Sequence, residues 1–319
     1  MRRWPRWALC AVMVGSALGC AGPAAETVGP AVTAPAHTGT WERFAEDGRI
    51  GRYTSSSWTF STVSYWIEGD DGVVVIDTQF VESEARELIE VAEAATGKPV
   101  VAAIVLHANP DKFNGTKVFQ DHGAKVLTSA QVLALIPEVH KKRVAAFYDR
   151  YKPDYPLTEP VPESFGDAAT ELELAGVPVK LHVVGAGCSA AHVVAQVGPH
   201  LFAGDLVANG THSWLELGLT DAWLERVAEL EAMGARFVHP GRGASGGVEL
   251  LTAQREYLEA VAAAVAAEHP ALPVDPAGLK RVTEHLVARY PDHRFAVFLK
   301  IGLPAEWRRQ ASQPPVGGP

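Results

Sequence analysis

Short unbroken apolar runs that alternate with amphipathic segments constrain the fold of this chain most strongly. The run VVAAIVLH (100–107) has no polar residue before its final histidine, which is typical of a strand buried on both faces. Residues 82–96 instead carry apolar side chains near helical spacing and end at Gly97-Lys98-Pro99, a helix stop signal. The pattern predicts an α/β protein.

This alternation occurs twice, in two halves joined by the proline-rich stretch 152–166, which we expect to run over the surface. Asp70-Asp71-Gly72 predicts a hairpin turn between the first two strands. The remaining expected strands are 100–107, 124–129, 170–176, 177–187, 192–198, 200–207 and 235–241, and the expected helices are 82–96, 130–151, 220–234 and most of the chain from Val248. Strands followed by helices, twice over, predict two sheets packed face to face with helices outside.

The N-terminus has the pattern of an export signal. MRRWPR is positively charged, and the apolar segment that follows is too short to span a bilayer. The ending Ala-Leu-Gly-Cys resembles a bacterial lipobox, in which Cys20 becomes the lipidated first residue. An ordinary signal cleaved near Ala21 or Ala25 is the alternative. Residues 21–40, rich in Ala, Pro, Gly and Thr, are expected to form a flexible tether.

Charge and cysteine content exclude some classes of protein. Without Arg2, Arg3 and Arg6, the chain has 25 basic and 37 acidic residues, which argues against nucleic acid as a partner. The run HKKR (140–143) is expected to be a solvated helix face. Three cysteines, two of them in or at the signal, allow no disulfide framework. Cys188 therefore needs a separate explanation.

Five landmarks in order resemble those of the metallo-β-lactamase superfamily over roughly residues 50–250. They are Gly72 to Thr78 (GVVVIDT), His107 to Lys112 (HANPDK), Gly185 to Ser189 (GAGCS), Leu201 to Asp205 (LFAGD) and His239 to Gly243 (HPGRG). The resemblance implies a four-layer αββα sandwich over residues 41–250. A C-terminal helical extension over residues 251–319 resembles, less specifically, that of periplasmic members linked to quinoprotein relay systems.

The same resemblance places the metal ligands position by position. The first zinc ion would be held at His107, Asn109 and Cys188, and the second at Asp111, Lys112, Arg242 and the bridging Asp205. A Cys thiolate binds zinc well, and an Asn amide offers a weak neutral oxygen. Protonated Lys and Arg side chains have no lone pair to donate to a metal. The dinuclear site is therefore expected to be degraded.

The two cations suggest what replaced the second zinc ion. Without metal, Asp111 and Asp205 would be buried and unpaired, which costs several kcal/mol. Lys112 and Arg242 could neutralise them, and arginine suits bidentate pairing with carboxylates. We therefore expect an ion-pair network at this position and take Asp111, Lys112 and Arg242 as the side chains that act in the cleft.

The first metal position stays open at this stage. His107, Cys188 and Asp205 could hold one soft divalent ion, with His192 or His239 as a fourth ligand, so at most one zinc ion is expected. Alternatively, Cys188 is a small buried residue in place of histidine, or a reactive thiol with a lowered pKa. Other histidines, among them His122, His140, His200 and His269, are expected to be surface or packing residues, whereas His212 and Trp214 could line the cleft mouth.

Two functions follow from these alternatives. One is a weakly active or inactive protein, lipid-anchored in the periplasm or cell envelope, that binds a small molecule or an envelope protein in the old cleft. Lys112, Arg242 and Asn109 would favour an anionic ligand if the aspartates leave those charges free. The other is a mono-zinc hydrolase with His107, Cys188 and Asp205 as ligands, and a purely structural role in the envelope is a third possibility.

Overall fold

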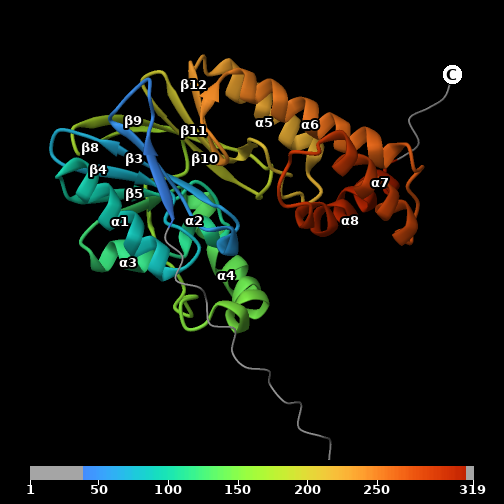
Figure 1. Ribbon diagram of the computed structural model, residues 1–319, viewed down its shortest axis with the longest axis horizontal. Coiled ribbons are helices and arrows are strands. Elements are labelled where there is room, and N and C mark those ends of the chain that lie inside the picture. Colours follow the sequence, from blue (N-terminus) through green and yellow to red (C-terminus); the bar gives the residue numbers. More distant parts are fainter. Residues whose placement is uncertain (1–38, 314–319) are drawn as a thin grey trace, which may run out of the picture. The chain divides into compact units, whose positions relative to one another are not determined.

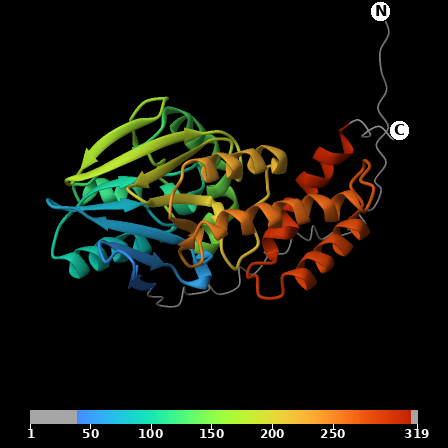
Figure 2. The same cartoon turned by 90° about the horizontal axis from the view of Figure 1, so that it is seen from above.

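The computed structural model describes residues 39–313, which contain two β-sheets with helices packed outside them (Figures 1 and 2). The first sheet has seven strands in sequential order: β1 (Thr40–Arg43), β2 (Ile50–Thr54), β3 (Val63–Glu68), β4 (Val73–Ile76), β5 (Val100–Ile104), β6 (Lys125–Thr128) and β7 (Glu163–Ser164). The second has six, in the order β13-β12-β11-β10-β9-β8: β8 (Thr170–Leu174), β9 (Val177–Val184), β10 (His192–Val197), β11 (His200–Ala208), β12 (Phe237–Arg242) and β13 (Gly246–Gly247).

Eight α-helices accompany these sheets in the described part of the chain. They are α1 (Glu82–Thr96), α2 (Pro110–Phe113), α3 (Thr116–Asp121), α4 (Ala130–Tyr151), α5 (Thr220–Ala232), α6 (Glu249–Ala266), α7 (Pro276–Arg289) and α8 (Val297–Ala311). Within residues 39–313, none of these helices combines the length and apolar character needed to cross a membrane.

Local sequence explains why these elements form where they do. The four residues of β4 are all buried, and β3 pairs with β4 across the predicted hairpin turn. Helix α1 ends at Gly97, whose φ of 71° is costly for any residue with a Cβ atom. Helix α4 begins at Ser129, whose hydroxyl accepts a hydrogen bond from the Val132 amide. The predicted αββα sandwich with C-terminal helices is confirmed.

The C-terminal helices share a hydrophobic core with the second sheet. Leu206 of β11, Val227 of α5, Leu258 of α6 and Leu303 of α8 are all fully buried in the same cluster. The expected boundary of the extension at residue 250 is therefore not a boundary of this core, although the division into domains stays a prediction.

One part of the expected surface connection is buried. Tyr155, within the proline-rich stretch 152–166, is 1% exposed and packs its ring against Phe80. The prolines correctly predict irregular backbone, but they do not reveal that the stretch folds back onto Phe80 and α4.

Candidate functional site: an ion-pair network beside a His-Cys-His cluster

The site lies where strands of both sheets end. Asp77 follows β4, the loop 105–109 follows β5, and Arg242 ends β12. Because β4, β5 and β6 run parallel, their carboxyl ends meet at one edge of the sheet, as in other sheets whose loops carry the functional side chains. Leu106 accepts a hydrogen bond of 2.6 Å from the Val193 amide, so the two halves of the chain meet at this edge.

The four residues expected at the second metal position come together as a buried ion-pair network. The Lys112 Nζ lies 2.9 Å from Asp205 Oδ1 and 3.3 Å from Asp111 Oδ2. The Arg242 guanidinium lies 2.7 Å from Asp111 Oδ2 and 3.5 Å from Asp205 Oδ2. All four side chains are at most 7% exposed. The cations occupy the space between the carboxylates that a metal ion would need.

The other terminal nitrogen of Arg242 also has partners. One guanidinium nitrogen donates to the Phe60 carbonyl oxygen at 2.7 Å and to the Thr62 hydroxyl at 3.1 Å. The Thr62 hydroxyl in turn donates to Asp111 at 3.2 Å. The charges of Lys112 and Arg242 are therefore both neutralised by carboxylates inside the protein. They are not left free, so the condition under which they would favour an anionic ligand is not met.

Electrostatics show that the network is charged and balanced. Burial would raise the pKa of Asp205 and Asp111, but Lys112 and Arg242 outweigh it and hold the pKa of both carboxyls below their ordinary range. Burial likewise opposes the charged form of Lys112, yet the aspartates keep the pKa of its ammonium above the usual value. Two carboxylates and two cations thus stay ionised at neutral pH.

A third buried carboxyl group, that of Asp77, lies next to Lys112 of this network. Burial raises the pKa of Asp77 to about 7, although Lys112 at 3.7 Å counteracts it. One oxygen of Asp77 accepts a hydrogen bond from the Leu106 amide at 2.9 Å. The backbone of Asp77 has a φ of 65°, a region that Asp tolerates better than most residues.

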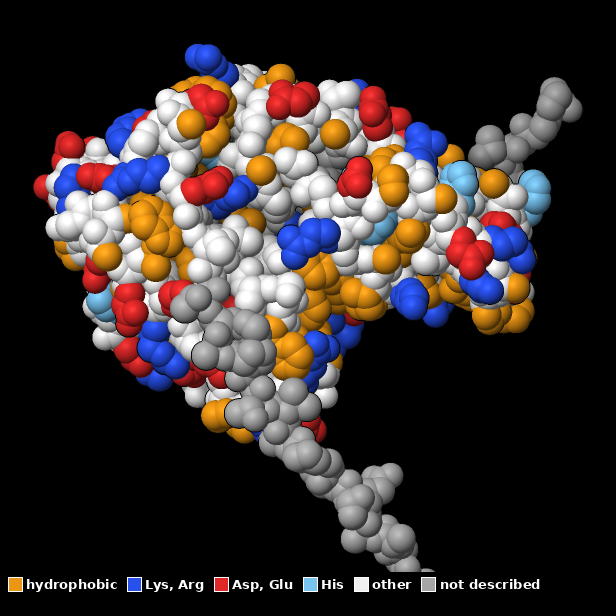
Figure 3. Space-filling view, viewed as in Figure 1, with side chains coloured by type: hydrophobic (Ala, Val, Ile, Leu, Met, Phe, Trp, Pro, Cys, Tyr) orange, Lys and Arg blue, Asp and Glu red, His pale blue; other side chains and the backbone are white. Residues whose placement is uncertain are grey.

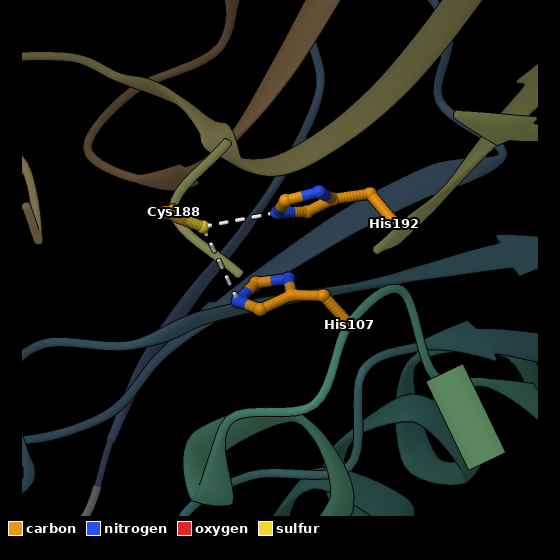
Figure 4. A group of neighbouring side chains, drawn as sticks. All are labelled: His107, Cys188 and His192. Atoms are coloured by element: carbon orange, nitrogen blue, oxygen red, sulfur yellow. Dashed lines mark hydrogen bonds between the residues drawn. The ribbon is translucent and has the colours of Figure 1, made fainter. Parts of the chain in front are cut away.

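Beside the network, His107, Cys188 and His192 form a second cluster (Figure 4). The Cys188 sulfur lies 3.2 Å from His192 Nε2 and 3.8 Å from His107 Nε2. All three side chains are buried, and burial raises the pKa of the Cys188 thiol well above its usual value. Burial also lowers the pKa of His107 to about 4 and that of His192 to about 3, so both imidazoles are neutral at pH 7.

The fit of these residues to zinc differs between the two positions. The second position does not fit a metal ion, because cationic nitrogens fill it and no lone pair is offered by Lys112 or Arg242. At the first position, two neutral imidazoles and one thiol suit a single soft ion. Asn109 lies in the neighbouring cleft, where its side-chain amide makes no hydrogen bond with any other described residue.

His239, considered as a further ligand, points away from this cluster. Its Nδ1 lies 2.8 Å from the Ser245 hydroxyl and its Nε2 lies 3.0 Å from His200 Nδ1. His200, expected to be a surface or packing residue, is buried, and its other ring nitrogen lies 3.4 Å from Asp47. These contacts join residues far apart in sequence, so no local pattern could have indicated them.

A small cleft lies beside Arg242. Its volume is about 30 Å³, and it is bounded by residues from eight separate segments: Phe60, Phe80, Asn109, Pro110, Asp111, Arg143, Phe147, Asp205, Trp214, Arg242 and Phe298. The C-terminal extension narrows it, since Phe298 of α8 lies over the Arg242 guanidinium at 5.4 Å. Trp214 lines the cleft as expected, whereas His212 is buried against Tyr257.

The cleft rim also corrects the expectation for the run HKKR. Arg143 is 8% exposed and pairs with Glu216 across the cleft mouth, so this helix face is not simply solvated. Figure 3 shows apolar side chains gathered around the recess between α4 and α8. Arg143, Phe60 and Phe298 are the site residues that sequence reasoning missed.

Comparison with known proteins establishes the family. Residues 58–242 match the model of the metallo-beta-lactamase superfamily, and the chain belongs to that superfamily. A metallo-beta-lactamase from Pontibacter korlensis aligns over 70% of this chain and 99% of its own, with a TM-score of 0.58 and 20% identity. DIM-1 metallo-beta-lactamase aligns over 69% and 97%, with a TM-score of 0.56 and 19% identity.

A third similar structure is FIM-1 from Pseudomonas aeruginosa in its mono-zinc form. It aligns over 69% of this chain and 95% of its own, with a TM-score of 0.54 and 16% identity. At these identities the likeness shows the fold alone. No curated protein sequence matches the chain.

Proposed function

We propose that this protein is a non-hydrolytic binding protein of the metallo-β-lactamase fold, exported and anchored to the cell envelope through Cys20. One observation carries the proposal. Lys112 and Arg242 lie at 2.9 and 2.7 Å from the two aspartates that would otherwise hold the second metal ion. Metal-dependent hydrolysis in this fold requires an ion with an open position for water. The cations leave no such position there.

The ligand that suits the cleft is small and uncharged. Aromatic rings form the walls, the Asn109 amide offers an unused donor and acceptor, and the charge of Arg242 is already balanced. A volume of about 30 Å³ holds one or two water molecules, so a larger ligand must displace Phe298 or Trp214. We therefore propose a compact aromatic or aliphatic molecule with one amide or hydroxyl group.

A second candidate, the mono-zinc hydrolase, is favoured by one specific observation. His107 Nε2 lies 3.8 Å from both the Cys188 sulfur and Asp205 Oδ2, so these three groups could converge on one ion. Against it, Asp205 already interacts with Lys112 and Arg242. A carboxylate that already interacts with two cationic side chains is a poor ligand for a divalent metal ion.

Metal content and hydrolysis separate the two candidates. The full chain is purified in detergent without chelator, its metals are counted by inductively coupled plasma mass spectrometry, and it is assayed on lactam, ester and thioester substrates. The matched comparison restores histidine at four positions: Asn109→His, Lys112→His, Cys188→His and Arg242→His. We expect at most one metal ion and no hydrolysis in the wild type, and two zinc ions in the restored variant. Zinc-dependent hydrolysis by the wild type would overturn the proposal.

Ligand binding and anchoring have their own tests. Small amides and alcohols are screened by ligand-observed NMR, with Asn109→Leu expected to weaken binding roughly tenfold through loss of its hydrogen bonds. A hit that Asn109→Leu leaves unchanged would place the ligand elsewhere. Cys20→Ala is expected to move the protein from the membrane fraction to the soluble fraction.

A further inference from the structure

We infer that His107, Cys188 and His192 together form a binding site for one copper(I) ion. The inference deepens the proposed binding function, on which it rests, by naming one ligand of the protein. It also departs from the ligand positions that the family resemblance implies. His192 takes the role expected for Asn109, whose amide is a weak donor for a soft ion.

The spacing of the three donor atoms suits one shared ion. An ion about 2.3 Å from sulfur and about 2.0 Å from nitrogen separates those two ligand atoms by roughly 3.7 Å in a trigonal arrangement. The sulfur-to-nitrogen distances here are 3.2 and 3.8 Å, on either side of that value. All three donor atoms lie within 4.8 Å of one another (Figure 4).

A hydrogen bond to the backbone orients the imidazole of His192, whereas Nδ1 of His107 has no hydrogen-bond partner among the described residues. The His192 Nδ1–H donates to the Gly185 carbonyl oxygen at 3.0 Å, which leaves Nε2 as the acceptor nitrogen beside Cys188. Nε2 accepts a hydrogen bond from the Ser189 amide at 3.3 Å, and a bound ion would take the place of that donor. The backbone also holds the rings together, because His107 and His192 form an isolated antiparallel bridge between the two halves of the chain. Their rings lie 5.1 Å apart.

Charge favours a monovalent ion over zinc. A thiolate and copper(I) sum to zero charge, which suits a buried cluster beside an ion-pair network that is already balanced. A thiolate and Zn²⁺ would leave one positive charge without a partner, and an unpaired charge in a buried site is costly. Each of the three side chains is at most 2% exposed, so the cluster has no open side for the water that commonly completes a zinc site.

The types of ligand atom also favour copper(I) over zinc. Thiolate and imidazole are donors that copper(I) accepts, and three donors satisfy it. Zinc would require a fourth, and the nearest carboxylate, Asp205, interacts with two cations. On binding, the copper–sulfur bond replaces the Cys188 S–H bond and the proton leaves to solvent. Copper enters as copper(I), so no oxidant or reductant is needed.

A competition titration tests the site. The full chain in detergent is titrated anaerobically with copper(I) acetonitrile salt in the presence of bicinchoninate, a coloured copper(I) chelator. We expect the wild type to withdraw one equivalent, and X-ray absorption to show one sulfur and two nitrogen ligands. Cys188→Ser and His192→Gln should each weaken binding at least a hundredfold. His239→Gln, a buried histidine outside the cluster, is the control and should bind as the wild type does.

The outcomes of this copper titration can be distinguished from those of the hydrolysis test. Failure of the folded wild type to withdraw copper, unchanged affinity in folded His192→Gln, or displacement of copper(I) by equimolar zinc would each overturn the inference. None of these results would be evidence that the protein hydrolyses a substrate, so the proposed non-hydrolytic function would stand. Circular dichroism on every variant confirms that a loss of binding is not a loss of fold.

Discussion

The Arg242 guanidinium lies 2.7 Å from the Asp111 carboxylate, although the two residues are 131 positions apart. Asp111 follows β5 of the first sheet, and Arg242 ends β12 of the second. The same guanidinium donates to the Phe60 carbonyl, on the segment before β3. This ion pair therefore joins the two sheets at the position that the family resemblance gives to the second metal ion.

Replacing Arg242 should destabilise the fold strongly. Arg242→Met leaves Asp111 buried with less compensation, and breaking a buried pair from one side costs about 3–5 kcal/mol. Urea unfolding measures the loss. The exposed pair of Lys117 and Asp121 provides the control, because Lys117→Met should change stability little. The double variant Asp111→Leu/Arg242→Met should recover part of the loss, and a double variant as unstable as the sum of both single changes would contradict the pairing.

The sequence predicts most of this fold because central strands such as β4 and β11 are buried on both faces and the turns carry strong signals. The helix 82–96 emerges as expected, the strand expected over 100–107 forms but ends at Ile104, and Lys112 and Arg242 lie where the motif order places them. Motif order works here because each landmark lies within a strand or directly after one, so the regular elements fix its place in the fold.

The sequence does not predict the closed cleft or the third member of the His-Cys-His cluster. Phe298 covers Arg242 from a helix 56 positions further along the chain, and its position depends on packing against the second sheet. The sequence offers His192 as a possible fourth ligand, because a histidine four residues after Cys188 carries no sign of where its ring points. The contact of 3.2 Å becomes visible only when β10 is placed against the loop 185–191.

Gly241 should tolerate no side chain, because it lies against Asp205. A Cβ atom at this position would be 2.0 Å from Asp205 Oδ1 and 2.7 Å from its backbone nitrogen. Gly241→Ala must therefore displace Asp205 from Lys112, and we expect a loss of about 3 kcal/mol in the free energy of unfolding. Gly48→Ala, where no atom lies within 4 Å of the added Cβ, should change it by less than about 1 kcal/mol. Equal effects of the two substitutions would count against the close approach.

His239 should make the protein sensitive to acid. Burial lowers the pKa of His239 to about 3, from 6.5 in the unfolded chain. The unfolded state therefore binds the proton first, and stability is lost as the pH falls from 6.5 towards 3. From pH 7 to pH 5 the wild type should lose about 2 kcal/mol more than His239→Gln. Urea unfolding of both proteins at the two pH values gives this difference, and parallel losses would show that His239 is not buried in its neutral form.

Glu84 should make the protein less stable as the pH rises, the opposite of the effect of His239. Its carboxyl is 3% exposed and accepts a hydrogen bond from Thr59, and burial raises its pKa to about 7, from 4.5 in the unfolded chain. The folded state then binds the proton more tightly, so stability is fully present below pH 4.5 and is lost as the pH rises through 7. Between pH 5 and pH 8 the wild type should lose about 2–3 kcal/mol relative to Glu84→Gln.

Glu90, exposed on the same helix as Glu84, provides the matched control. Glu90→Gln removes the same formal charge from α1 but buries nothing, so its stability should follow the wild-type pH profile. Urea unfolding of the three proteins at pH 5 and pH 8 separates the effect of burial from that of net charge. If Glu84→Gln and Glu90→Gln flatten the profile equally, the pH dependence arises from the overall charge of the helix, and the Thr59–Glu84 contact does not hold a protonated carboxyl.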